Sequence, residues 1–179
     1  MNITLTKADF EEAEEYANLS KGYTSDRHDF HKGGLNNKKI YMFFGKLGEK
    51  AVRQLFVNHN ILYVEDKTGY DEGDNYDFLV YINGTEFKVD VKTRTKLFHT
   101  RTLEMVEQMR VKPKDLYISV SLNDQSVGDT KKVSIIGYIT RDALLKINRI
   151  ENLGYLDNYV CNDNELSDIS ILLNNLDKI

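Results

Sequence analysis

The sequence YDFLVYINGTEFKVDVKT, residues 76–93, decides the fold of this chain. At its centre lies the dipeptide Asn83-Gly84, which strongly predicts a β-hairpin because a type I′ turn needs positive φ at both central positions. The residues on either side are typical of strands. We therefore expect two antiparallel strands joined by a two-residue turn.

The two-residue turn fixes which residues lie opposite one another, and the resulting register separates two faces of the hairpin. One face is apolar and pairs Ile82 with Thr85, Val80 with Phe87, and Phe78 with Val89. The other face pairs Tyr81 with Glu86, Leu79 with Lys88, and Asp77 with Asp90. Because like charges directly opposite destabilise a sheet, the last pair suggests that a cation lies between the two carboxylates.

Asp77, Asp90 and Lys92 share the polar face of this hairpin and could carry chemistry together. Two carboxylates on adjacent strands can bind one Mg²⁺, an ion that prefers oxygen ligands and keeps several waters. Such an ion polarises a phosphoryl oxygen and lowers the pKa of a bound water. Lys92 could then hold the attacking water or offset charge on the phosphate. The alternative is an exposed sheet face on which charges simply alternate.

Length and composition indicate one globular domain, residues 1–179, with 41% hydrophobic and 29% charged residues. Cys161 is the only cysteine, so neither an internal disulfide nor a cysteine zinc cluster is expected. The N-terminal residues do not resemble a signal peptide, and no apolar run is long enough to span a bilayer. We therefore expect a cytoplasmic protein with no membrane partner.

The net charge of −4 is unevenly distributed along the chain. Residues 21–53 and residues 88–114 each contain eight Lys or Arg against three Asp or Glu, whereas the acidic excess lies elsewhere. Local positive charge of this kind favours a polyanion such as nucleic acid as a partner, despite the negative total. A mixed, solvated surface is the alternative that charge alone leaves open.

Apolar periodicity predicts helices before the hairpin. Thr6 and Asp9 resemble a helix N-cap with an acidic first turn, and residues 20–40 indicate a long loop. A second helix is expected over residues 44–59. Glu49 falls on the border between its apolar stripe and a basic face made by Lys46, Lys50 and Arg53.

The remaining pattern predicts a mixed central β-sheet flanked by helices, in the α/β or α+β class. A segment from Thr102 to about Arg110 could be a short helix or could be extended. The other expected elements are strands over 61–65, 116–122 and 133–140 and helices over 142–150 and 166–176.

The residues Gly45-Lys46-Leu47-Gly48-Glu49, Asp77 and Asp90-Val91-Lys92-Thr93 together resemble the PD-(D/E)XK nuclease superfamily, the restriction-endonuclease-like fold, in a small phage-type form. In that family a helix supplies a glutamate, and a hairpin supplies an aspartate and then the acid-x-lysine motif. The expected core order αβββαβ, over about residues 43–150, also agrees. Two departures are Tyr76 in place of proline and Asp90 as the shorter of the two acids that the motif allows.

This resemblance implies a DNA endonuclease that uses Mg²⁺ or Mn²⁺, in the host cytoplasm if a phage encodes it. The implied catalytic residues are Glu49, Asp77, Asp90 and Lys92. The implied metal ligands are Asp77, Asp90, the Val91 carbonyl and Glu49, which would hold a metal-bound water or a second ion. The expected phosphate contacts are Lys46, Lys50, Lys88, Arg94, Lys96 and Arg101.

Several alternatives stay open at this point. Asp74 competes with Asp77 as the first aspartate, and Glu49 could be a surface residue paired with Arg53. The fold could also serve a catalytically silent DNA-binding or inhibitor module. A junction resolvase would additionally predict a homodimer.

Overall fold

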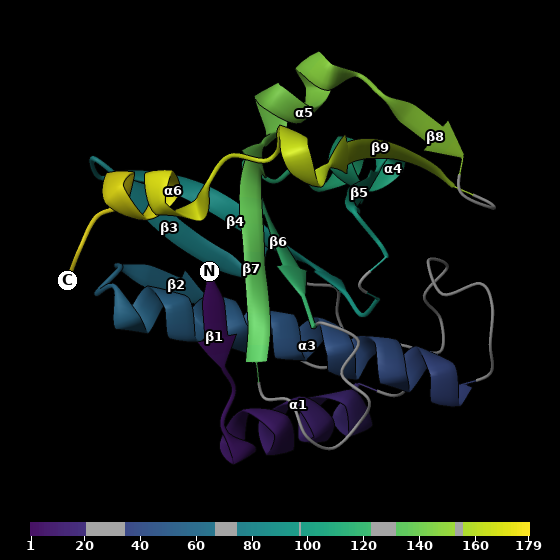
Figure 1. The fold of residues 1–179 in the computed structure, drawn as a ribbon, viewed down its shortest axis with the longest axis vertical. Helices are drawn as coiled ribbons and strands as arrows, with labels where there is room; N and C mark the ends of the chain where they lie inside the picture. The colour runs from purple at the N-terminus through teal and green to yellow at the C-terminus, as the bar shows by residue number, and fades with distance from the viewer. Residues whose placement is uncertain (21–34, 67–74, 97, 123–131, 153–155) are drawn as a thin grey trace.

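The computed structural model describes residues 1–20, 35–66, 75–96, 98–122, 132–152 and 156–179, and Figure 1 shows how their helices and strands are arranged. Within these residues the chain forms a six-stranded mixed sheet, a three-stranded antiparallel sheet and several helices. The expected mixed α/β (α+β) class with a mixed central sheet is therefore confirmed.

The hairpin predicted from residues 76–93 forms in the large sheet. Strands β3 (Phe78–Ile82) and β4 (Thr85–Arg94) pair antiparallel, and each cross-strand pair between them is the predicted one. Asn83 and Gly84 have φ values of 50° and 73°, as a type I′ turn requires. Local turn chemistry and alternation are therefore sufficient to set this register.

The large sheet extends the hairpin on both sides, in the strand order β1-β7-β6-β4-β3-β2. Its other strands are β1 (Asn2–Thr4), β2 (Tyr63–Glu65), β6 (Leu116–Ser121) and β7 (Lys132–Thr140). Neighbouring strands are antiparallel except for β4 and β6, which are parallel. A parallel pair needs a crossover connection, and here the crossover contains part of the second sheet.

The smaller antiparallel sheet has the order β5-β9-β8 and covers one face of the large sheet. Its strands are β5 (Arg101–Met105), β8 (Ile150–Asn152) and β9 (Asp157–Asn162). Of the two alternatives left open for the segment from Thr102 to about Arg110, the extended one holds in the first half, where β5 forms, and the helical one in the second half, where α4 (Val106–Val111) forms. The strands β1, β8 and β9 were not predicted, because they are short and owe their extended form to pairing with distant residues.

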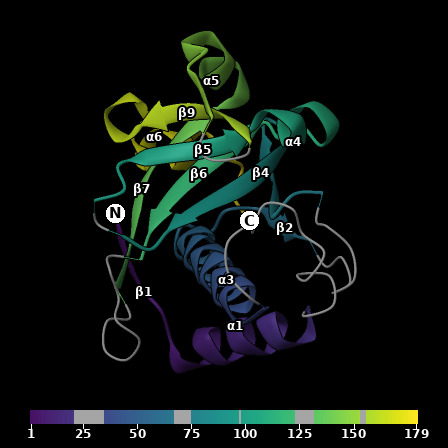
Figure 2. The same cartoon turned by 90° about the vertical axis from the view of Figure 1, so that its right-hand side faces the viewer.

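Two long helices cover the opposite face of the large sheet. Helix α1 (Lys7–Leu19) packs on α3 (Leu35–Asn58), which lies across the sheet, so Figure 2 shows successive layers of α1, α3, large sheet and small sheet. The predicted helix over 44–59 is confirmed but begins earlier, so the loop predicted at 20–40 is wrong from residue 35 onward. Residues 21–34 of that loop lie outside the described part of the chain.

Two apolar cores hold these layers together. The larger core lies between α3 and the large sheet, and within it the buried rings of Phe56 and Phe78 meet edge to face with centroids 5.4 Å apart. The smaller core lies between the two sheets and includes Tyr117 and Cys161. The remaining short helices are α5 (Arg141–Ile147), η1 (Asp163–Glu165) and α6 (Ile169–Asn175).

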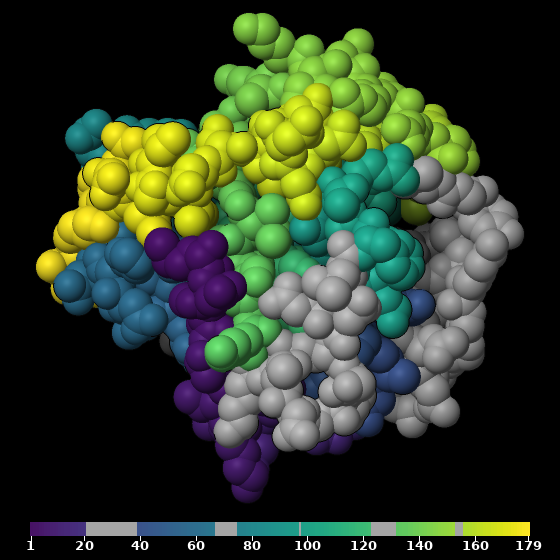
Figure 3. All heavy atoms as spheres, in the orientation of Figure 1, coloured from purple at the N-terminus to yellow at the C-terminus, as the bar shows by residue number. Residues whose placement is uncertain are grey.

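Both ends of the chain lie against the large sheet. In Figure 3 the N-terminal strand β1, in purple, and the C-terminal segment with α6, in yellow, lie beside β7, in green. Beyond α6, Asp177 accepts hydrogen bonds from the amides of Asn83 and Gly84 at 2.9 and 2.7 Å. The C-terminal segment thereby holds the hairpin turn in place.

Candidate active site

The four predicted catalytic residues come from helix α3, from the residue before β3 and from strand β4, and they are Glu49, Asp77, Asp90 and Lys92. Gly48 allows the helix to approach the strand, since a Cβ at this position would lie 1.9 Å from Thr93 Oγ1. Thr93 follows the predicted lysine directly, and Gly48 precedes the predicted glutamate. This contact therefore brings the two motifs together.

Asp77 lies where the regular ladder of the hairpin ends. Its amide donates to the carbonyl of Val89 at 2.9 Å, and its Oδ2 accepts a hydrogen bond from the Val91 amide at 2.6 Å. The predicted direct cross-strand pair of Asp77 with Asp90 does not form, because the ladder ends at Phe78–Val89 and the Asp77 amide bonds to Val89 instead of continuing the register. The Asp77 carboxylate instead supplies the acceptor that a backbone carbonyl would offer in a continuing ladder.

The pKa of the Asp77 carboxyl is raised well above its ordinary value. Burial is the largest cause, and the negative charges of Glu49 and Asp90 add to it, whereas Lys46 and the Val91 amide oppose it. Carboxylates from three elements are therefore close enough to repel one another. Such an excess of negative charge favours the binding of a cation.

The ammonium of Lys92 lies between carboxylates from two different sheets. Its Nζ is 2.7 Å from Oδ2 of Asp90 on β4 and 2.5 Å from Oε2 of Glu104 on β5. The ring of Tyr117 on β6 has its centroid 5.8 Å from the same nitrogen. Burial lowers the pKa of Lys92, but the two carboxylates more than offset it, so the pKa lies above its ordinary value. Lys92 is therefore a cation at neutral pH rather than a base.

Glu104 is a candidate functional residue that the sequence analysis missed. Its side chain has 0% exposed surface, and burial is the main reason that its pKa is raised, while Lys92 acts in the opposite direction. On β5 the polar Thr102 and Glu104 are buried and the apolar Leu103 is exposed. Strands usually bury their apolar residues and expose their polar ones, and β5 does the reverse. The alternation of apolar residues therefore does not indicate that Glu104 faces the site.

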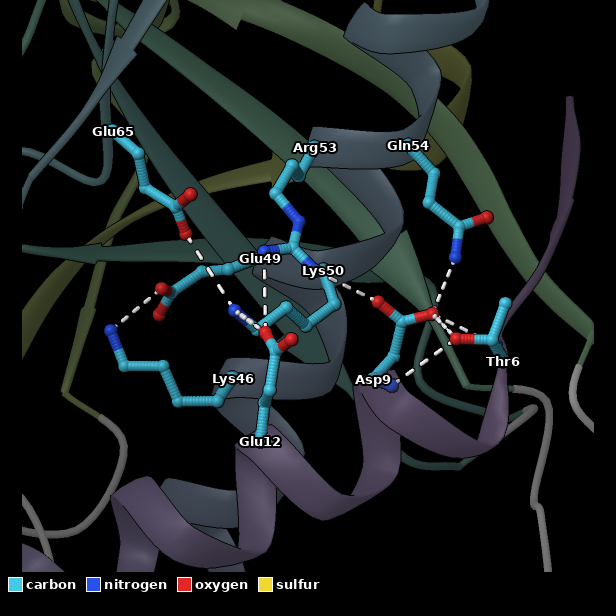
Figure 4. Close-up of polar contacts among 9 residues, drawn as sticks. All are labelled: Thr6, Asp9, Glu12, Lys46, Glu49, Lys50, Arg53, Gln54 and Glu65. Atoms are coloured by element: carbon cyan, nitrogen blue, oxygen red, sulfur yellow. Dashed lines mark hydrogen bonds and ion pairs between the residues drawn. The ribbon is translucent and has the colours of Figure 1, made fainter.

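Glu49 forms an ion pair with Lys46 on α3, which Figure 4 shows together with the neighbouring polar contacts, and both side chains are largely buried. Lys46 Nζ lies 2.7 Å from Glu49 Oε2. The alternative in which Glu49 pairs with Arg53 is wrong, because Arg53 instead contacts Asp9 and Glu12 of α1 at 3.0 and 3.2 Å. Glu49 thus stays on the side of α3 that faces the hairpin motif rather than the side that faces α1.

The acidic helix α1 covers the basic face of α3. Thr6 and Asp9 form the predicted N-cap as a full capping box, and Asp9 also accepts a hydrogen bond from Gln54 on α3. Lys50 lies 2.8 Å from Glu12, and its hydrogen bond is the largest cause of the lowered pKa of that carboxyl. Charges that are distant in sequence therefore neutralise one another in the fold.

At least four of the six cations predicted to contact phosphates form ion pairs within the described residues. These pairs are Lys46–Glu49, Lys50–Glu12, Arg94–Asp163 and Arg101–Glu151. Arg94 is 12% exposed and grips its partner with two bonds of 2.6 and 2.7 Å, so it ties β4 to η1. Lys88 and Lys96 are exposed.

The part of the chain that the structure describes contains no group of three or more His, Cys, Asp or Glu side chains arranged to hold a metal ion. The hairpin carboxylates Asp77 and Asp90 each have one oxygen engaged, with Val91 and Lys92 respectively. Among the described residues no hydrogen bond reaches Oδ1 of either. Two such oxygens fit an ion that keeps most of its waters, as Mg²⁺ does. The rival Asp74 lies outside the described residues.

Comparisons with models of known protein families, with curated proteins and with solved structures found no match. None of the helices in the described residues is both long and apolar enough to cross a membrane.

Replacing Asp77 with asparagine should stabilise the metal-free protein at neutral pH. Because the folded-state pKa is raised, the ionised carboxylate costs stability at neutral pH, and this cost disappears as the pH falls and the group binds a proton. Asparagine removes the charge, and its Oδ1 can still accept the Val91 hydrogen bond. We expect a gain of about 0.5–2 kcal/mol in the free energy of unfolding at neutral pH.

Urea denaturation at neutral pH and near pH 3, below the ordinary pKa of aspartate, measures this effect. Asp142→Asn is the control, because the Asp142 side chain is 91% exposed. A variant no more stable than the wild type at neutral pH would contradict the proximity of the three carboxylates.

Proposed function

We propose that this protein is a Mg²⁺- or Mn²⁺-dependent DNA endonuclease of the PD-(D/E)XK type. The observation that carries the proposal is the convergence of Asp77, Asp90 and Lys92 with Glu49 from the neighbouring helix. The order α3, β2, β3, β4, α4 and β6 supports it, because it agrees with the αβββαβ core of the restriction-endonuclease-like fold once β5, which belongs to the small sheet, is set aside as an insertion between β4 and α4.

Each residue has a role that follows from its position. Asp77 and Asp90 would hold the ion through their Oδ1 atoms, with the Val91 carbonyl as the further ligand that the resemblance implies. The bound ion would supply Lewis acidity toward the phosphate and lower the pKa of a water. Lys92, as a cation, orients the attacking water or offsets charge on the phosphate. Glu49 can accept a hydrogen bond from a water in the same space.

DNA would be held first by the cations that are accessible. Lys88 and Lys96 are exposed. Lys46, Lys50, Arg94 and Arg101 would have to exchange an internal carboxylate for a phosphate. Such contacts position the backbone of the nucleic acid and do not select its sequence. We therefore expect weak dependence of cleavage on base sequence at these positions.

Supercoiled plasmid offers a direct test of the proposed function. The wild type should nick it with Mg²⁺ or Mn²⁺ and not with EDTA. Asp77→Asn and Asp90→Asn should lower the rate by about 100-fold or more, since each removes a group that organises charge at the reacting phosphate. Asp142→Asn, an exposed aspartate on α5, should cleave as the wild type does. Activity in EDTA, or full activity of Asp90→Asn, would refute the mechanism.

A catalytically silent module on the same fold is the second candidate. The observation in its favour is that at least four of the six expected phosphate-binding cations are paired within the described residues. It predicts DNA binding in Ca²⁺ without cleavage in any divalent metal, or no DNA binding at all. Filter binding in Ca²⁺, run beside the plasmid assay, separates the two functions.

A further inference from the structure

Glu104 brings a buried carboxylate from the small sheet into the site that the large sheet forms. Its Oε2 lies 2.5 Å from Lys92 Nζ, and its side chain has no exposed surface. This contact joins β5 to β4 at the predicted catalytic lysine, although the two strands belong to different sheets. Because the pair is shielded from solvent, salt screens it little.

The positive charge of Lys92 faces more negative charge than its neutralisation requires. Asp90 lies 2.7 Å away on the same strand and would suffice as a counter-ion. Oε1 of Glu104 has no hydrogen-bond partner among the described residues, and the same is true of the buried Tyr117 hydroxyl. Buried polar atoms without partners cost stability, so ion pairing alone does not account for Glu104.

We propose that Glu104 is a positioning residue that fixes the Lys92 ammonium beside Asp90, so that the small sheet forms one wall of the site. A lysine side chain has four rotatable bonds, and a single contact with its own strand leaves the nitrogen free to move. A second contact from the opposite sheet restricts it. When Asp90 engages a bound cation, Glu104 is the carboxylate that remains to hold Lys92.

Two measurements test this role, and only one of them depends on the proposed nuclease function. The first is acetylation of lysine amines by an amine-reactive reagent, read residue by residue by mass spectrometry on the intact protein. In Glu104→Gln, Lys92 should be acetylated about tenfold faster than in the wild type, because its nitrogen is no longer held in a buried contact. Glu151→Gln is the matched control, since Glu151 forms an exposed ion pair with Arg101 in the same small sheet.

The second measurement is the rate of plasmid cleavage. Glu104→Gln should lower kcat by about 10- to 100-fold with KM unchanged, as expected for a group that orients a catalytic residue. Glu104→Asp keeps the charge but shortens the side chain, so it should be intermediate, and it replaces Glu104→Gln if that variant does not fold. Glu104→Gln combined with Lys92→Met should be no slower than Lys92→Met alone.

Each outcome has a distinct meaning. Unchanged acetylation of Lys92 in Glu104→Gln, or an equal change in Glu151→Gln, overturns the positioning role. Faster acetylation of Lys92 in Glu104→Gln with kcat unchanged would show that the contact exists but does not affect catalysis. A further loss of rate in the double variant would show that Glu104 affects catalysis by a route other than Lys92. Either result overturns the proposal that Glu104 positions Lys92 for catalysis. Faster acetylation while the wild type cleaves no DNA with Mg²⁺ or Mn²⁺ overturns the proposed function and supports the contact.

Discussion

Replacing Lys92 with alanine is expected to lower the free energy of unfolding by about 3 kcal/mol at neutral pH. Asp90 and Glu104 are 8% and 1% exposed, and both would lose the cation that they share. Removing one member of a buried ion pair leaves charge without compensation. The deficit should shrink as the pH falls, because burial raises the pKa of the Glu104 carboxyl, which then binds a proton in the folded variant.

Urea denaturation at neutral pH and at acidic pH measures this change. Lys7→Ala provides a matched control, because the Lys7–Glu11 pair is 85% and 63% exposed and should contribute less than about 1 kcal/mol. An alanine variant at position 92 as stable as the control would show that the contacts of Lys92 do not exist in solution. The same variant should also lack plasmid cleavage.

Gly48→Ala is expected to destabilise the protein by about 2 kcal/mol or more, as overpacking does in well-packed interiors. The added Cβ would lie 1.9 Å from Oγ1, 3.0 Å from Cβ and 3.1 Å from Cγ2 of Thr93, so rotation of that side chain alone cannot relieve the overlap. Helix α3 would have to move away from β4. The distance between Glu49 and Lys92 would then increase, and cleavage should fall with stability.

Gly45→Ala is the control, one turn earlier on the same helix. A Cβ at Gly45 would meet no atom within 4 Å, and alanine favours helix over glycine by about 0.5–1 kcal/mol. Opposite signs for the two substitutions in urea denaturation are therefore expected. Equal effects would contradict the close approach of α3 to β4 that places the proposed site.

Local sequence was sufficient where neighbouring residues decide conformation. Asn83-Gly84 set the turn, and the alternation of apolar residues around it set the register from Ile82–Thr85 to Phe78–Val89. The cap formed by Thr6 and Asp9 was likewise visible. In each case the signal lies within a few residues, because turn geometry and side-chain period are properties of the local chain.

The distribution of charge on the surface was predicted less well, because it depends on which helices pack against each other. The counted excess of cations in residues 21–53 suggested a basic surface, yet α1 sets Asp9 and Glu12 against Arg53. These partners are more than forty positions apart in the sequence. Counting charge along the chain cannot reveal a pair that forms only when two helices pack.

Local patterns were enough to predict the hairpin, the helix that carries Glu49, and the placement of Asp90 and Lys92 on one strand face. Folding in three dimensions was needed to bring Asp77 out of the ladder, where it accepts a hydrogen bond from Val91, and to bring Glu104 of the second sheet to Lys92. Alternation and turn chemistry act between neighbours in the chain, whereas burial and electrostatic contact act between neighbours in space.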